Sequence, residues 1–261
     1  MKTFWILGFA GTLALGQAAR AEVQAKDVEY RDGETALQGY LAWDDAVAGP
    51  RPGVLVAHAW MGLGDFERRR ARELAALGYA AFAIDVYGKD VRPQNAEEAA
   101  QLSGSYKADR DLMRRRAQAG LDELARQKIC AGQPVAAIGY CFGGTVALEL
   151  ARSGAPLAGV VSFHGGLATP NPEDVRQIKA RIFVLHGADD PLVPPAEVQA
   201  FQDEMRTAGV DWQFVAYGGT VHAFTDPAAG SDSSKGVAYN AVADRRSWQA
   251  MQAFLEEVLR P

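Results

Sequence analysis

Three residues of the types that cooperate in nucleophilic catalysis occur in contexts that suit this chemistry. The first is Cys141, in the run Gly139-Tyr140-Cys141-Phe142-Gly143, which joins an apolar segment of strand length to an apolar segment typical of a buried helix. A strand that turns abruptly into a helix strains its central residue, and glycines two positions away remove side chains that would collide. This turn would expose the thiol at a helix N-terminus, where the helix dipole favours the reactive thiolate.

Candidates for a base and for its orienting acid follow downstream. His222 lies in a Gly/Ser/Asp-rich loop after one apolar run, and Asp190 follows another. A nucleophile of this kind needs a base, and the base needs an orienting carboxylate. The order nucleophile, acid, histidine is that of the α/β-hydrolases, and the run at 186–194 resembles their acid loop. The resemblance places the acid at Asp190, with the neighbouring Asp189 as the alternative.

The same arrangement predicts an oxyanion hole and a pocket. One donor should be the backbone N–H of Phe142, directly after the nucleophile, and the other should be Trp60, after the strand at 54–57. Apolar candidates for the pocket wall are Trp60, Met61, Tyr140, Phe142 and Phe224. Ordinary core packing is the alternative for each of them.

The other histidines also follow predicted strands, so we expect them near the same sheet edge. They are His58, His164 and His186. No pair of candidate ligands has the helical or Cys-x-x-Cys spacing of a metal site, and we therefore expect no metal. The simpler interpretation is that these histidines hydrogen-bond the loop backbone beside the pocket.

Composition indicates one large α/β domain. The chain has 261 residues, of which 48% are hydrophobic and 23% charged, and its formal net charge is −5. This mild acidity, without a basic stripe, gives no support for a nucleic-acid partner. The two cysteines, Cys130 and Cys141, are too few for a disulfide framework. A bridge between them would block the nucleophile, so we favour two free thiols.

The N-terminus is typical of a secretory signal peptide. Lys2 precedes an apolar run at 4–15 that is too short to span a bilayer, and Ala19-Arg20-Ala21 offers a cleavage site. We therefore expect a signal peptide over residues 1–21, cleaved near Ala21, and a single domain over residues 22–261. The mature protein would be secreted or periplasmic, without a stable membrane anchor. An ordinary N-terminal helix or a retained anchor is the alternative.

The remaining sequence supplies the elements that must position the site. A β-hairpin is predicted around Asp32-Gly33, with strands at 28–31 and 37–43. Further strands are predicted at 54–57, 79–85, 135–138, 157–163, 182–185 and 212–217. Helices are predicted at 65–77 with Asp65 as its cap, near 96–102, at 107–127 with a solvated Arg114-Arg115-Arg116 face, at 145–151, at 195–208 and at the C-terminus. This alternation predicts an α/β fold with a mostly parallel sheet and helices on both faces.

Several motifs resemble the dienelactone hydrolase family of α/β-hydrolases. They are the elbow at 139–144, the stretch at 75–88, the acid loop at 186–194 and His-Ala-Phe at 222–224, followed by Tyr239-Asn240 and Ser247-Trp248. The resemblance covers nearly the whole chain after residue 21. It implies the α/β-hydrolase fold and hydrolysis of a lactone or ester through a cysteine acyl-enzyme, without a cofactor.

The chain departs from this family at positions that contact the substrate or the thiol. The archetype's glutamate, which holds the resting cysteine, is matched by Ala59. Tyr106 matches a tyrosine of the carboxylate clamp, but the two clamp arginines are matched by Leu102 and Asp226. The resemblance thus adds Ala59 and Tyr106 to the predicted pocket, and we expect neutral esters to be better substrates than carboxylate-bearing lactones. The cations that would replace the clamp are Lys89, Arg92 and Lys107.

Two functional interpretations follow. The first is an exported hydrolase of small esters, lactones or thioesters that uses a Cys141-His222-Asp190 triad, with a monomer favoured over an oligomer. The second is a non-catalytic ligand-binding or redox-active thiol protein on a hydrolase scaffold. Ala59 slightly favours the second interpretation, whereas the complete set of thiol, imidazole and carboxylate favours the first.

Overall fold

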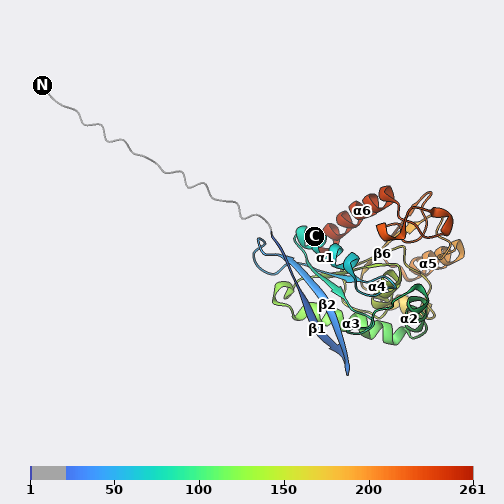
Figure 1. Ribbon diagram of the computed structural model, residues 1–261, viewed down its shortest axis with the longest axis horizontal. Helices are drawn as coiled ribbons and strands as arrows, with labels where there is room; N and C mark the ends of the chain where they lie inside the picture. The colour runs from blue at the N-terminus through green and yellow to red at the C-terminus, as the bar shows by residue number, and fades with distance from the viewer. Residues whose placement is uncertain (2–21, 261) are drawn as a thin grey trace.

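A computed structural model describes Met1 and residues 22–260, so the predicted signal peptide and its cleavage site lie outside the described residues. An eight-stranded sheet runs through the molecule in the order β1-β2-β4-β3-β5-β6-β7-β8 (Figure 1). The strands are β1 (Val23–Asp32), β2 (Thr35–Asp44), β3 (Gly53–Ala57), β4 (Ala80–Ile84), β5 (Val135–Tyr140), β6 (Gly159–Phe163), β7 (Arg181–Gly187) and β8 (Trp212–Tyr217). The hairpin β1–β2 joins the sheet through antiparallel pairing of β2 with β4. In the sheet order from β4 to β8, all neighbouring strands are parallel.

Helices cover both faces of the sheet. Helices α1 (Asp65–Ala76) and α6 (Ala241–Leu259) pack on one face, and α3 (Arg110–Arg126), α4 (Phe142–Arg152) and α5 (Pro195–Ala208) pack on the other (Figure 1). Helix α2 (Ala96–Ala108) packs against α3. Short 3₁₀ turns complete the chain: η1 (Lys128–Cys130), η2 (Pro172–Gln177), η3 (Pro227–Ala229) and η4 (Ser233–Lys235). The predicted fold class is confirmed.

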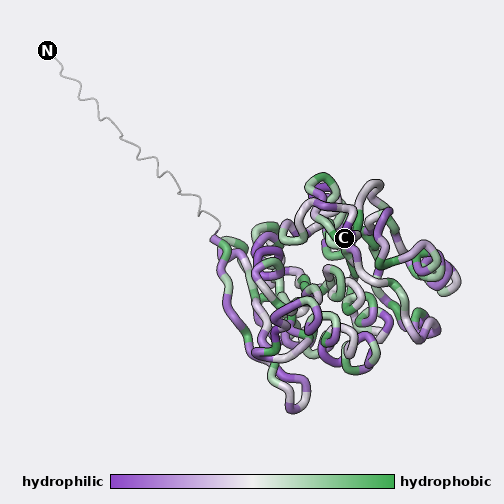
Figure 2. Tube along the Cα trace, turned by 45° about the vertical axis from the view of Figure 1, so that its right-hand side comes forward, coloured by the Kyte–Doolittle hydropathy of each residue, from purple (hydrophilic) through white to green (hydrophobic). Residues whose placement is uncertain are grey.

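The central strands lie in the core because they are continuous apolar runs. Every residue of β3, β4, β5 and β6 is buried, as expected for parallel strands that are covered on both faces. Figure 2 shows apolar segments gathered in the middle of the molecule, with hydrophilic ones more frequent along the outer hairpin. This rigid, apolar sheet holds the loops at the carboxyl ends of its strands, where the candidate site lies.

Several predicted helix boundaries differ from the structure; for example, the helix predicted at 145–151 already begins at Phe142. The helix predicted at 107–127 is divided at Asp109, which ends α2 and begins α3, and its carboxylate accepts the Leu112 N–H at 2.9 Å. A carboxylate that satisfies a free N–H at a helix start favours a new helix over continuation of the old one. Asp65 is the first residue of α1 rather than its cap, and Gly64 takes the cap position.

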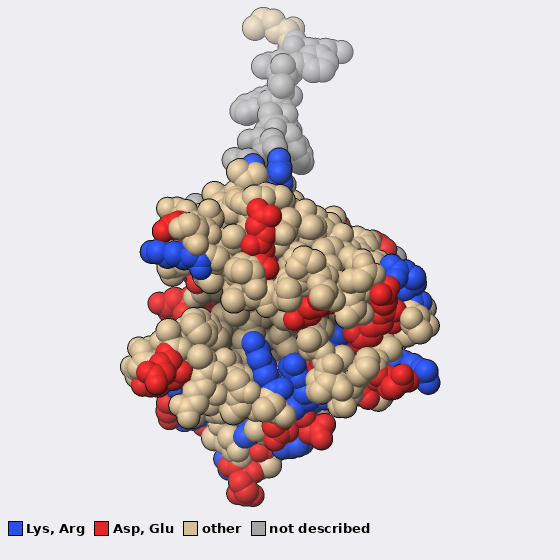
Figure 3. All heavy atoms as spheres, turned by 90° about the vertical axis from the view of Figure 1, so that its right-hand side faces the viewer, with Lys and Arg blue, Asp and Glu red and all other residues tan. Residues whose placement is uncertain are grey.

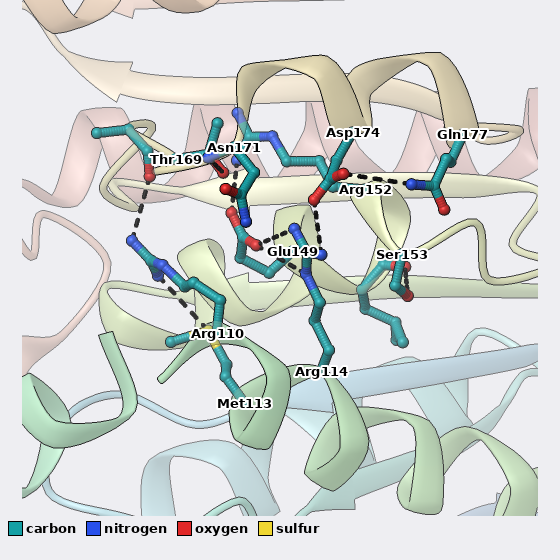
Figure 4. Close-up of polar contacts among 12 residues, drawn as sticks. Arg110, Met113, Arg114, Glu149, Arg152, Ser153, Thr169, Asn171, Asp174 and Gln177 are labelled. Carbon is teal, nitrogen blue, oxygen red and sulfur yellow. Dashed lines mark hydrogen bonds and ion pairs between the residues drawn. The ribbon is translucent and has the colours of Figure 1, made fainter. Parts of the chain in front are cut away.

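The prediction that the Arg114-Arg115-Arg116 run forms a solvated face was wrong for two of its members. Arg114 lies 2.7 Å from both Glu149 and Asp174 (Figure 4), and Arg116 lies 3.1 Å from Asp32. Only Arg115 is exposed. Glu149 lies on the fully buried helix α4, where an unpaired charge would be costly, so Arg114 faces inward to compensate it.

The surface carries both signs of charge. The face in Figure 3 mixes acidic and basic side chains around a central hollow, with no basic stripe across it. Among the helices of the described residues, none combines the length and the apolar character needed to cross a bilayer.

Candidate active site

The turn between β5 and α4 holds Cys141 in a strained conformation. Its φ is +54°, in a region that non-glycine residues rarely adopt. A Cβ on Gly139 would lie 1.9 Å from the Gly143 carbonyl oxygen, and a Cβ on Gly143 would lie 2.1 Å from the Ala57 carbonyl oxygen. Both positions therefore require glycine, which is the steric reason predicted from the sequence. The sharp turn places the Cys141 thiol at the start of α4, facing a cavity.

Three side chains from three separate loops meet at this turn. The Cys141 Sγ lies 3.1 Å from Nε2 of His222, and Nδ1 of His222 lies 2.8 Å from Oδ2 of Asp190. Asp190 is held in place because its other carboxylate oxygen accepts the Leu192 N–H at 2.8 Å. Asp190 is therefore the aspartate that contacts His222, whereas the neighbouring Asp189 is exposed.

These contacts favour an ion pair between thiolate and imidazolium. Burial by itself raises the pKa of the Cys141 thiol, but the hydrogen bond and charge of His222 outweigh burial and lower it. Burial by itself lowers the pKa of His222, but the contacts with Asp190 and Cys141 outweigh burial and raise it. By contrast, burial without a charge partner raises the pKa of the Cys130 thiol to about 11. Both cysteines are free thiols.

A cavity of about 510 Å³ opens beside the thiol. Ala59, Met61 and Tyr140 line it, as predicted, together with Trp60 and Phe142. Most of the wall is apolar, and Trp60 and Met61 remain partly exposed to solvent. The shape and lining suit a small organic substrate that presents one electrophilic centre to the thiol.

Tyr106 and Phe224 do not line this cavity, contrary to the prediction. The Tyr106 hydroxyl donates to the Tyr87 carbonyl oxygen at 3.1 Å, and its ring packs behind Phe142. Phe224 is fully buried, with its ring 5.0 Å from that of His164. Both side chains support the wall from behind, because their neighbours on the same segments occupy the cavity surface.

Of the three cations considered as a replacement clamp, one lies at the cavity. Lys107 is the only lysine or arginine among the residues that line this cavity, and Asp226 also lines it. Lys89 pairs instead with Glu29 of the hairpin. Arg92 donates to backbone carbonyl groups, among them that of Leu63 at 3.2 Å.

The other histidines surround the site without forming a metal centre. His58 is buried, accepts the Val86 N–H at 3.1 Å, and burial lowers its pKa to about 4. The His164 ring lies 5.2 Å from that of His222, and the His186 ring packs against Phe214. The described residues bring together no group of three His, Cys, Asp or Glu side chains that could hold a metal ion.

Sequence reasoning missed two buried polar residues of the cavity wall. Glu67 accepts the backbone N–H of Ala59 at 3.1 Å and of Gly64 at 2.9 Å. Its position three residues after the helix cap is a capping-box spacing, which would have predicted the second contact. Oγ1 of Thr225 lies 2.8 Å from Nε2 of His164, and no local pattern indicates this contact.

The sheet order, the strained elbow and the contacts of Cys141 define an α/β-hydrolase. The profile of the dienelactone hydrolase family matches residues 37–259, and the chain belongs to that family. It is therefore a dienelactone hydrolase-like hydrolase that acts on a small-molecule substrate.

Three similar proteins place the chain within the family. A dienelactone hydrolase-like promiscuous phosphotriesterase, P91 from metagenomic libraries, is 46% identical, with a TM-score of 0.86 over 92% of this chain and 99% of P91. The structure named m3DLH is 44% identical, with a TM-score of 0.87 over 91% of this chain and 99% of its own. A putative carboxymethylenebutenolidase of Escherichia coli (strain K12) is 25% identical over 233 residues, covering 85% of this chain and 82% of that protein.

Proposed function

We propose that this protein is an exported hydrolase of small neutral esters, lactones or thioesters, with Cys141 as nucleophile, His222 as base and Asp190 as orienting acid. The observation that carries the proposal is the 3.1 Å contact between Cys141 Sγ and His222 Nε2 at the wall of an apolar cavity. A buried thiol without such a partner has a raised pKa, as Cys130 illustrates, and would be unreactive.

The proposed reaction passes through an acyl-enzyme. The Cys141 thiolate attacks the carbonyl carbon, and the leaving alkoxide takes the proton from Nε2 of His222, which leaves a thioester on Sγ. Neutral His222 then removes a proton from water as the water attacks the thioester. Collapse of that intermediate releases the carboxylic acid and restores the thiolate and imidazolium, whose charge Asp190 stabilises across 2.8 Å.

The proposed oxyanion donors are the backbone N–H groups of Phe142 and Trp60. Phe142 is the first residue of α4, and its N–H already helps to lower the pKa of Cys141. Trp60 lies in the loop after β3, where its carbonyl oxygen accepts the Tyr87 hydroxyl at 2.9 Å. Fixed donors of this kind stabilise the developing oxyanion because they need no reorganisation during the reaction.

A second candidate activity is hydrolysis of neutral phosphotriesters. P91, which is 46% identical, is described as a promiscuous phosphotriesterase. A phosphotriester resembles a neutral ester in having an electrophilic centre without a negative charge, which suits this largely apolar cavity. Thiolate attack on phosphorus would release an alcohol and leave an S-phosphoryl cysteine, which water must then hydrolyse.

The nucleophile is tested by Cys141→Ala and Cys141→Ser with a panel of p-nitrophenyl esters and a p-nitrophenyl phosphotriester. We expect Cys141→Ala to lose all turnover while it stays folded, because alanine fits the turn. Cys141→Ser should keep only a trace of activity, since serine depends fully on His222 for deprotonation. Mass spectrometry of the quenched wild-type reaction should find the acyl group on Cys141. A fully active Cys141→Ala would overturn the assignment of Cys141 as nucleophile, whereas a wild-type protein that turns over no member of the panel would favour the non-catalytic or redox-active interpretation.

Export is tested separately. Lys2, the short apolar run and Ala19-Arg20-Ala21 support cleavage after Ala21. N-terminal sequencing of the protein from its own host should begin at Glu22, and the protein should be found outside the cytoplasm. Mature protein that retains Met1 would contradict the proposal.

A further inference from the structure

His164 is a buried histidine beside the proposed triad to which the mechanism assigns no role. It follows β6 directly, is only 2% exposed and has a φ of +40°. Any residue that has a β-carbon is strained at such a positive φ, so surrounding contacts must hold His164 in this conformation. Those contacts join two loops that carry catalytic groups.

The first contact is to the nucleophile elbow. The Cys141 N–H points to Nδ1 of His164 at 3.1 Å and is shared with the Phe163 carbonyl oxygen at 3.0 Å. Because a backbone N–H can only donate, Nδ1 must be the unprotonated nitrogen of the ring. A neutral His164 then carries its proton on Nε2.

The second contact is to the loop of the proposed base. Nε2 of His164 lies 2.8 Å from Oγ1 of Thr225, so the tautomer set by Cys141 makes this nitrogen the donor. Thr225 is fully buried and follows His222 by three residues. Its backbone carbonyl oxygen is also fixed, by Arg70 at 3.3 Å.

The charges around His164 keep it in this neutral state. The titratable or charged groups that act on it are His222, Arg70 and His186, all of which oppose a further positive charge. Burial, the largest cause, lowers the pKa of His164 in the same direction. An imidazolium at this position would direct a second N–H against the Cys141 N–H, so the contact to the elbow requires the neutral ring.

We propose that His164 is a positioning residue: its hydrogen bond to Thr225 ties the His222 loop to the nucleophile elbow and maintains the separation of Cys141 Sγ and His222 Nε2. This inference rests on the proposed roles of Cys141 and His222. The 2.8 Å contact of Asp190 fixes the far side of the His222 ring, whereas the His164 bond fixes the loop relative to the thiol. Without the second restraint, the ion pair would loosen and the thiolate would be less stable.

The experiment measures the pH midpoint of Cys141 alkylation by iodoacetamide, with mass spectrometry of the Cys141 peptide so that Cys130 does not interfere. Thr225→Val removes the hydroxyl that accepts from His164 and keeps a side chain of nearly the same shape. Thr225→Ser is the matched control because it keeps the hydroxyl. We expect Thr225→Val to raise the midpoint by about one pH unit, which is about a tenfold loss of thiolate below it. Thr225→Ser should leave the midpoint in place.

His164→Asn provides an independent variant that tolerates the positive φ. Its amide oxygen can accept the Cys141 N–H, but the shorter side chain does not reach Thr225. We expect the same rise as in Thr225→Val, a fall in kcat with little change in KM, and no further rise in the double variant, because both changes remove one bond.

Three results would overturn the inference: unchanged midpoints in Thr225→Val and His164→Asn, equal shifts in Thr225→Val and Thr225→Ser, or additive shifts in the double variant. Circular dichroism and thermal melting would identify a variant whose shift comes from unfolding, in which case the other variant decides. The midpoint does not depend on turnover, so failure of this inference is distinguishable from failure of the proposed function, which Cys141→Ala tests by itself.

Discussion

At the scale of single residues, the proposed chemistry depends on one thiol whose charge is stabilised by one imidazole. Cys130 is buried and Cys141 is half-buried, yet the pKa of Cys130 is raised and that of Cys141 is lowered. The difference is the hydrogen-bonded His222 beside Cys141, which in turn is held by Asp190. A charged partner at hydrogen-bond distance outweighs the cost of desolvating the thiolate.

This ion pair predicts the pH dependence of the thiol. A lowered pKa means that Cys141 stays deprotonated below the free-thiol value of about 8.5, so alkylation should be fast at neutral pH and should fall only as pH drops through the lowered value.

Asp190→Asn should raise the alkylation midpoint and reduce kcat/KM by about 10²-fold or more, because His222 loses the carboxylate that stabilises its charge. The adjacent, exposed Asp189→Asn is the matched control and should match the wild type. Equal effects of the two substitutions would argue against Asp190 as the orienting acid.

At the scale of elements, the loop between β3 and α1 depends on one side chain of the helix. Glu67 is buried, and its two oxygens accept the N–H groups at the two ends of the segment 59–64, which carries Trp60. Burial raises the pKa of this carboxyl, although the backbone donors partly offset the effect. The carboxylate thus stabilises the start of α1 and the proposed second oxyanion donor together.

Glu67→Gln should lower both stability and kcat. The amide can accept only one of the two N–H groups through its oxygen, and its NH₂ opposes the other, which costs about 1–3 kcal/mol. We expect a lower melting temperature and a kcat that falls more than KM changes, because a loosened Trp60 N–H affects the transition state. Arg69→Gln, on the exposed side of the same helix, should leave both quantities close to wild type. A destabilised variant with unchanged kcat would show that the loop does not depend on this contact for catalysis.

At the scale of the whole molecule, the cavity collects charges from distant segments. Lys107 comes from the end of α2, Asp226 from the loop after His222, and Asp65 and Glu67 from α1. A substrate carboxylate would meet one lysine and three acidic side chains there, whereas a neutral ester meets mainly apolar wall. This balance supports the expected preference for neutral substrates.

The charge balance is tested by comparing a neutral p-nitrophenyl ester with a carboxylate-bearing lactone on the same preparations. The neutral ester should have the higher kcat/KM. Asp226→Asn should raise kcat/KM for the anionic lactone relative to the neutral ester, and Lys107→Ala should lower it, each by about three- to tenfold for charges at a solvent-accessible wall. Lys89→Ala removes a cation that is paired with Glu29, and it should leave the ratio of kcat/KM for the two substrates unchanged. A wild-type preference for the anionic lactone would mean that Lys107 outweighs the three acidic side chains.

The sequence by itself determined the features that depend on local sterics and on strand order. The glycines around Cys141 are required by clashes within or beside one turn, and apolar runs marked the central strands. The carboxyl ends of parallel strands lie at one edge of a sheet. The predicted parallel strands therefore sufficed to place Cys141, Asp190 and His222 at the same edge. Their catalytic roles remain a proposal.

Only the tertiary structure decided which side chains face the cavity and which charges are buried. Tyr106 and Phe224 lie behind the wall, and Arg114 turns inward to Glu149, because these orientations depend on the packing of elements that are distant in sequence. The contact between His164 and Thr225 spans 61 positions of the chain and leaves no periodic pattern. Hydrogen bonds of this kind are specified by the three-dimensional meeting of two loops, which local sequence does not encode.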